Sequence, residues 1–303
     1  MELQKDSLEQ TVKIENSPPS GIQVLLREFK KDKIAMFSLV VTALLIIVVM
    51  VAAVVIDQAQ VMKINLLERY TEPGVNGFIL GTDEAGRDMF GQLIIGAKNS
   101  IYIAVAITII TGIAGIALGL IMGYYGGFID SFIMRIIDFF MTLPMLMLII
   151  VFVSIIPKYG VFELILILSL FGWVSTARLV RSKVLSEGRR DYVSASKTMG
   201  TSDFAIMVKG ILPNISSILI IEMTLNFAGN VGIETGLSFL GFGLPPSTPS
   251  LGTLVSYAIN PQVLSEKWWV WLPASILILI LMLGINYVGQ ALRRAADAKQ
   301  RLG

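Results

Sequence analysis

The chain has 303 residues, of which 54% are hydrophobic and only 15% are charged, and its mean hydropathy is +0.75. Soluble domains carry about 25% charged residues, so this deficit is typical of a protein embedded in a membrane, where charge is costly. The chain contains no cysteine and no histidine, which excludes disulfide bonds, thiolate metal sites and catalytic triads that depend on histidine.

The chain begins with a polar, basic segment, residues 1–33, which we expect to lie in the cytoplasm. Its second part, 21–33, has apolar residues at helical spacing followed by basic ones, which favours an amphipathic helix along the membrane surface. The apolar positions are Ile22, Leu25, Leu26 and Phe29. A disordered tail is the alternative, and it fits residues 1–20 better.

Six apolar segments follow, and each approaches the length of about 20 residues that crosses a bilayer. They are residues 34–56, 101–122, 132–156, 161–177, 215–235 and 268–288. We therefore predict an all-α polytopic membrane protein with six transmembrane helices. Pro144 is expected to kink the third of them, since proline lacks the N–H that an interior helical bond needs.

Lysine and arginine indicate the orientation, because they collect in cytoplasmic loops. Six precede the first span, seven lie between the fourth and fifth, and four follow the sixth, which is 17 of the 24 basic residues. Both termini and the loop 178–214 are then cytoplasmic, and 57–98 is an extracellular loop. The core domain is 99–292, and 293–303 is a cytoplasmic tail.

The sequence lacks the usual signs of an enzyme. It has no G-x-x-x-x-G-K-[ST] motif for binding nucleotide phosphates and no pair of carboxylates at a catalytic spacing. No catalytic residue, metal, cofactor or nucleic acid is therefore expected. Transport and a structural role in the membrane remain.

A stripe of small residues marks the second span. Gly115, Gly119 and Gly123 are four apart, with Gly112 beside them, which predicts either close packing of two helices or a hinge. In the third span, Arg135 and Asp138 are three residues apart and can pair on one helix face, so we interpret them as structural.

Polar residues also recur along the fifth span, at intervals of four: Glu222, Asn226, Asn230 and Glu234. Helical periodicity places them in one slowly drifting stripe, and ionisable residues inside a span usually face a water-filled cavity or a partner. We therefore expect either a hydrophilic translocation pathway or hydrogen bonds to another subunit. Glu234 is expected near the outer interface.

The cytoplasmic loop should hold two short helices. Tyr192, Ala195 and Met199 repeat at three and four and can bury one face of the first helix, which Gly200 would end in a left-handed conformation. Thr201 or Ser202 can then cap the second. Such a pair predicts docking to a soluble partner, or packing against the ends of the chain's own helices.

Three motifs together resemble the C-type permease subunits of oligopeptide, dipeptide and nickel ABC importers. The first is the E-A-A loop motif, aligned with Ser194-Ala195-Ser196, Gly200 and Leu212-Pro213. It departs from the family's pattern at Ser194, which replaces Glu, and at Gly210, which replaces an apolar residue. The others are GTDEAGRD at 81–88 and ETGLSFLGFGLPPSTPSLG at 234–252, where Leu251 stands at a position that is often Trp. The resemblance runs from about Arg27 to the C-terminus.

The resemblance implies the fold of a type I ABC importer permease, with a cytoplasmic coupling helix, in the cell membrane. Its partners would be membrane lipid, a second homologous permease subunit, two cytoplasmic ATPase subunits, an extracellular substrate-binding protein and a peptide substrate. ATP hydrolysis would occur on the ATPase subunits. The ATPase-coupling residues would be Asp191, Tyr192, Ala195, Ser196, Met199, Gly200, Thr201, Leu212 and Pro213.

The outer motif 81–88 allows two interpretations. Asp83, Arg87 and Asp88 would shape the outer gate or contact the binding protein; alternatively, Thr82 or Asp83 caps a helix and the charges pair at a solvated surface. For the whole chain, a permease for nickel chelates or another small solute, a secondary transporter and a membrane scaffold remain alternatives to a peptide permease.

Overall fold

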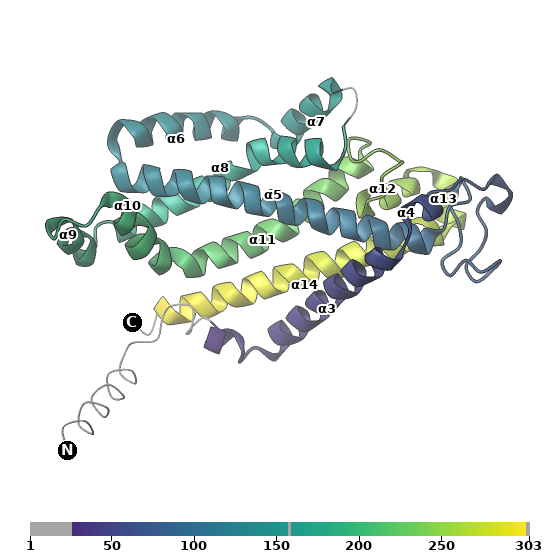
Figure 1. Cartoon of the computed structure of the whole chain (residues 1–303), viewed down its shortest axis with the longest axis horizontal. Coiled ribbons are helices and arrows are strands. Elements are labelled where there is room, and N and C mark those ends of the chain that lie inside the picture. The colour runs from purple at the N-terminus through teal and green to yellow at the C-terminus, as the bar shows by residue number, and fades with distance from the viewer. Residues whose placement is uncertain (1–25, 157–158, 301–303) are drawn as a thin grey trace, which may run out of the picture.

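The computed structural model describes residues 26–156 and 159–300, which form a bundle of long helices (Figure 1). In chain order the elements are α3 (Lys33–Val55), α4 (Gln58–Val61), η1 (Leu66–Glu68), α5 (Met89–Tyr125), α6 (Gly127–Thr142), α7 (Met145–Ile155), α8 (Val161–Glu187), α9 (Asp191–Thr198), α10 (Asp203–Ala205), η2 (Ile206–Ile211), α11 (Leu212–Phe239), α12 (Leu251–Ser256), η3 (Tyr257–Ile259), α13 (Pro261–Glu266) and α14 (Trp268–Gln300). Within the described ranges, the isolated bridge between Thr82 and Asp88 is the one strand-like pairing.

The short elements gather at the two ends of the bundle. In Figure 1, α9 and α10 lie at one end, and α4, α12 and α13 lie at the other. In the part of the chain that the structure describes, five helices are long and apolar enough to cross a membrane, and α6 with α7 makes a sixth crossing if this bent pair is counted as one. The predicted all-α class is confirmed, and so are the six spans when α6 and α7 are counted as one.

The second span is longer than predicted, because α5 begins at Met89 and covers 37 residues. Asp88 caps it: its carboxylate accepts from the backbone N–H groups of Phe90, at 3.2 Å, and Gly91, at 3.0 Å. The alternative in which Thr82 or Asp83 caps a helix is therefore wrong, since no helix begins directly after them. Asp88 also explains why the helix starts early, since a side-chain cap satisfies N–H groups that otherwise lack partners.

The third span breaks at its middle. Helices α6 and α7 meet at Leu143 and Pro144 with an angle of 85°. The carbonyl of Pro144 accepts from the N–H groups of Met147 and Leu148 and so starts a new helix. The predicted kink is confirmed, and it is sharp enough to turn the chain aside within the bundle.

The glycine stripe of α5 packs directly on α8. A Cβ atom added to Gly115 would lie 2.7 Å from Cβ of Thr176, and one on Gly123 would lie 2.6 Å from Cβ of Val184. Such distances leave no room for any side chain at these positions. Close helix packing is thus what this stripe does, as in other small-residue membrane interfaces.

Helices α3 and α14 lie side by side (Figure 1). At one end Asp32 caps α3 through the N–H of Ala35, at 3.0 Å, and pairs with Arg294 at 2.9 Å. The helical turn 26–29 places Phe29 in an apolar cluster with Leu292 of α14. Residues 21–25 of the expected amphipathic helix lie outside the described part.

The expected pair of Arg135 and Asp138 does not form. Asp138 instead lies 4.0 Å from Arg178 of α8, and Asp130 of α6 pairs with Arg181, with an Nη2–Oδ2 distance of 2.6 Å. Contacts between helices α6 and α8 thus replace the one expected within a helix. They fix α6 against α8 on the side of the break that faces α9.

Candidate functional site

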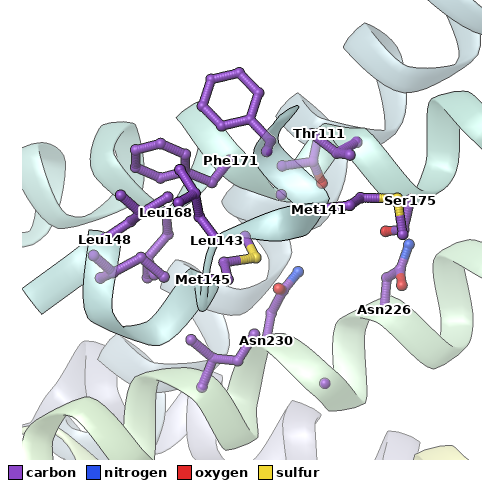
Figure 2. A pocket seen from close by; sticks show the side chains of 16 residues that line it. Thr111, Met141, Leu143, Met145, Leu148, Leu168, Phe171, Ser175, Asn226 and Asn230 are labelled. Atoms are coloured by element: carbon purple, nitrogen blue, oxygen red, sulfur yellow. The ribbon is translucent and has the colours of Figure 1, made fainter. Parts of the chain in front are cut away.

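A cavity of about 330 Å³ lies where the α6–α7 break meets α8 and α11 (Figure 2). Its wall is mostly apolar, with a few polar groups from facing helices. This composition is common in sites for small molecules. The polar side chains in the wall are Thr111, Ser175, Asn226 and Asn230.

Two of the four predicted pathway residues line this cavity. Asn226 and Asn230 project from α11 toward Ser175 and the broken segment at Leu143 and Met145 (Figure 2). Each amide is also anchored, because Asn226 donates to Oγ1 of Thr176, at 3.1 Å, and Asn230 to Oγ1 of Thr108, at 2.8 Å. Their Oδ1 atoms can still accept a bond from a solute.

The two glutamates of the predicted stripe lie elsewhere. Glu222 is half-buried outside the cavity wall, and Glu234 is completely buried. The carboxylate of Glu234 accepts from Oγ of Ser100, at 2.8 Å, and Oγ of Ser238, at 2.9 Å. Hydroxyl groups of this same chain therefore enclose Glu234. Its expected place near the outer membrane interface stays a prediction.

The segment at the α9 end contains the predicted glycine cap. Gly200 has φ of 78° and ends α9, and the backbone closes the turn through Thr201 N to Ser196 O at 3.1 Å. A left-handed residue with such a bond is typical of a helix C-terminus. The predicted side-chain cap of the second helix is absent: α10 begins after Ser202, whose side chain makes no capping bond.

The buried face of α9 is not the one that the spacing indicated. Val193 is 1% exposed and packs with Val184 and Ile211, whereas Ala195 is exposed and Met199 is 77% exposed. Valine fits the small gap between the ends of α8 and α11, and this packing turns the predicted face outward. Met199 and the 72% exposed Phe204 leave apolar surface at this end of the bundle.

Tyr192 joins α9 to the long helices. Its hydroxyl donates to Oε1 of Glu187 at 3.3 Å and accepts from Nδ2 of Asn214 at 3.1 Å. Burial raises the pKa of Tyr192, so the hydroxyl stays protonated and keeps donating. These two bonds connect α9 to the last turn of α8 and the first turn of α11.

The second short helix is also tied to the bundle. Asp203 accepts a bond of 2.6 Å from Tyr124 of α5, and the ammonium of Lys197 lies 4.5 Å from the centre of the same ring. Ile206 and Met207 are buried beside Leu120. The second short helix therefore packs against the chain's own helices, which is one of the two expected alternatives, while α9 keeps an exposed face.

At the opposite end, the motif 81–88 forms a buried cluster of hydrogen-bonded polar side chains. Asp83 is fully buried and accepts from Arg87 Nε, at 2.7 Å, and Gln92 Nε2, at 3.0 Å. Arg87 also donates to the hydroxyl of Tyr257, at 2.8 Å, and to the carbonyl of Pro246, at 3.3 Å. The charges pair with each other as one alternative expected, but they do so inside the protein.

Tyr257 is the third member of this polar cluster, with Asp83 and Arg87. Burial raises its pKa, and the neighbouring Asp83 carboxylate raises it further, so the phenol stays neutral. Asp83, Arg87 and Tyr257 thus hold the loop before α5 against the segment after α11. Asp88 acts separately as the cap of α5.

Four hydrogen-bond partners of the candidate site residues were not predicted from the sequence: Thr108, Thr176, Ser100 and Tyr257. The first three are small hydroxyl residues inside or next to apolar spans, where a polar stripe on another helix would need donors or acceptors. A search for such hydroxyls opposite Asn226 and Asn230 could have found them. Their pairing with a given amide depends on helix rotation, which periodicity does not supply.

Membrane-length helices around a cavity with anchored amides define an integral membrane protein of the transport class. The chain matches the family described as binding-protein-dependent transport system inner membrane component over residues 115–302. Residues 20–71 match the N-terminal transmembrane domain of oligopeptide transport permease C.

Curated relatives are similar over most of their length. The oligopeptide transport system permease protein OppC of Lactococcus lactis subsp. lactis is 48% identical over 93% of this chain and 96% of its own length. OppC of Bacillus subtilis is 35% identical, over 90% and 88%, and the dipeptide transport system permease protein DppC of that organism is 34% identical, over 91% and 85%.

The chain therefore belongs to the binding-protein-dependent transport system inner membrane components. It is a multi-pass membrane permease subunit of an ABC importer and not its ATPase. The resemblance to C-type permeases is confirmed.

Proposed function

We propose that this chain forms half of the translocation pathway of an ATP-driven importer for oligopeptides or dipeptides. The observation that carries this proposal is the cavity at the α6–α7 break, where Asn226 and Asn230 offer amide groups beside an apolar wall. Backbone amides and apolar side chains are the two surfaces that any peptide presents, and this wall matches both. The names of the relatives support the same substrate class.

The end of the bundle that carries α9 is the cytoplasmic end in this proposal, and both termini lie on that side. Seven basic residues fall in the segment between the fourth and fifth spans, against four in the loop after the first. Such an excess is typical of the cytoplasmic side. The α12 end is then extracellular and would meet a substrate-binding protein.

The coupling element comprises Asp191, Tyr192, Ala195, Ser196, Met199, Gly200, Thr201, Leu212 and Pro213. Its exposed part, Met199 and neighbouring Phe204, would dock on one of two ATPase subunits. Tyr192 and Val193 then carry the displacement to α8 and α11. These two helices supply Ser175, Asn226 and Asn230 to the cavity, so movement at α9 changes the cavity's shape.

The second permease subunit would cover the open side of the cavity, across the exposed apolar surface of α6 and α7. Asp83 and Arg87 would support the outer gate by holding its loops, with Asp88 fixing the start of α5. Direct contact with the binding protein would fall to the exposed Glu84 beside them.

Reconstitution of the complete importer in proteoliposomes tests the proposal. The binding protein is added outside the vesicles and ATP is enclosed inside them. Labelled di- to pentapeptides should then accumulate in the vesicle lumen. Accumulation that needs ATP and survives collapse of the proton gradient supports it. Uptake that follows the proton gradient without ATP would favour a secondary transporter, and uptake of nickel chelates but not peptides would favour that alternative.

A further inference from the structure

The chain between α11 and α12 packs beside residues of the cavity wall. We call residues 240–250 the outer closure. Leu244 and Phe242 of the outer closure pack with Ile149, Leu168 and Phe171, three residues that also line the cavity. The outer closure therefore packs directly behind part of the cavity wall.

On one side, one side-chain hydrogen bond among the described residues joins the outer closure to the segment just before α8. The hydroxyl of Tyr159 donates to the carbonyl of Gly243, at 2.6 Å. Leu244 also packs there in one apolar cluster with Leu164. Apolar contacts lack direction, so this side can separate without leaving several buried polar groups unpaired.

On the other side, a connected set of hydrogen bonds joins the outer closure and Leu251, the first residue of α12, to α5, and Oγ of Ser250 lies 3.5 Å from Oγ of Ser238. Glu234 accepts from Ser100 and Ser238, and Oγ of Ser100 accepts in turn from the N–H of Leu251, at 3.0 Å. Asn99 donates to the carbonyl of Pro249 at 2.8 Å.

The packing on this second side is equally close. A Cβ atom on Gly96 of α5 would lie 3.0 Å from the carbonyl carbon of Ser250. Leu251 and Leu254 are buried against Leu93 and Ala97 of α5. Breaking this side would deprive the fully buried carboxylate of Glu234 of its hydrogen bond from Ser100, which costs more than parting the apolar side.

We propose that Glu234 is a positioning residue that fastens the outer closure to α5, so that α5, α11 and the outer closure move as one body. The passage then opens to the outside by separation at Tyr159 and Gly243, on the α8 side. This inference rests on the proposed function and adds which side of the passage moves. Glu234 acts through Ser100 and Ser238, without touching the cavity.

The chain has no cysteine, which allows a direct test by a single Leu244→Cys reporter. The reporter is labelled from outside by a membrane-impermeant maleimide in the complete resting importer, and labelling of this chain is measured by mass. It is compared in backgrounds carrying Glu234→Leu, Ser100→Ala or the conservative Glu234→Gln. Peptide uptake per ATP hydrolysed is measured for the same backgrounds.

Glu234→Leu and Ser100→Ala should each raise the labelling rate about tenfold, the size expected for losing a buried hydrogen bond. Both should also lower the peptide carried per ATP about threefold on the same argument, because a loose closure lets hydrolysis proceed without transport. Glu234→Gln keeps a hydrogen-bonding group at the site and should restore most of both values. Tyr159→Phe should raise labelling while leaving the peptide carried per ATP near that of the parent.

Equal labelling of the parent, Glu234→Leu and Ser100→Ala importers would overturn the inference, as would equal defects in Glu234→Leu and Glu234→Gln. If Glu234→Leu does not insert, the milder Ser100→Ala decides between these results. Failure of the parent importer to take up peptide, with the labelling pattern intact, would refute the proposed function and leave the role of Glu234 standing.

Discussion

Asn230 of α11 donates a hydrogen bond of 2.8 Å to Oγ1 of Thr108 on α5. Thr108 is buried and donates its own proton to the carbonyl of Ala104, at 2.7 Å. The amide of Asn230 is therefore held at the cavity by a hydroxyl whose bonding does not depend on it. This separates what the amide does for transport from what it does for the fold.

Asn230→Leu should lower peptide uptake about tenfold, because it removes an amide that would bind the peptide backbone. Thr108 keeps its bond to Ala104, so the amount of inserted protein should stay near that of the parent. Thr108→Val is the matched control, since it releases the amide without removing it and should cost less uptake. Equal uptake by Asn230→Leu and the parent would argue against a pathway at this residue.

Gly200→Val should abolish uptake and the stimulation of ATP hydrolysis while membrane insertion is preserved. Gly200 has φ of 78°, and a Cβ atom there would meet nothing within 4 Å. The penalty is thus one of backbone conformation, about 1–2 kcal/mol for an ordinary residue. Gly200→Asn, which tolerates this conformation better, should keep most of the activity. Identical behaviour of the Val and Asn variants would contradict the role assigned to this turn.

Gly119→Val should reduce the yield of folded protein, measured by size-exclusion chromatography in detergent. Its side chain would enter the space that Val180 and the backbone of Ala177 occupy, so α5 and α8 must separate. Overpacking of this kind costs about 1–3 kcal/mol. The control is Gly236→Ala on α11, where the added methyl group meets nothing within 4 Å. Equal yields of the two variants would mean that the close packing is dispensable.

Asp83→Ala should loosen the loop before α5 and expose it to protease. It leaves Arg87, whose side chain is mostly buried, without its carboxylate, and breaking a buried pair from one side costs about 3–5 kcal/mol. Limited proteolysis of the importer should cut between residues 62 and 88 faster than in the parent. Asp57→Ala is the control, because Asp57 is exposed and caps only the short α4. Unchanged cleavage would show that the polar cluster around Asp83 does not hold the loop before α5.

The spans were predictable because long apolar runs and helix formation follow from local composition. The start of α5 was not, since Lys98 and Asn99 look like loop residues until Asn99 is seen to bond the distant carbonyl of Pro249. The bend of α6 against α7 was foreseen at Pro144, whereas its angle depends on what the two halves pack against.

For the site, helical periodicity placed Asn226 and Asn230 on one face, and the cavity contains both. It could not separate them from Glu234, because a four-residue repeat drifts around the helix and neighbouring helices decide which positions they cover. The same limit applies to α9. Val193 is buried there only because α8 and α11 end beside it.

The central claim is that the passage follows the cavity beside Asn226 and Asn230. Single-cysteine variants at 226, 230 and 228 of this cysteine-free chain test it most directly, by reaction with a water-soluble thiol reagent during ATP-driven turnover with peptide. Asn226→Cys and Asn230→Cys should react and block uptake, while Ala228→Cys should stay unmodified, because Ala228 is fully buried on the same helix and lies outside the cavity wall. Failure of Asn226→Cys and Asn230→Cys to react in any transport state would contradict the account.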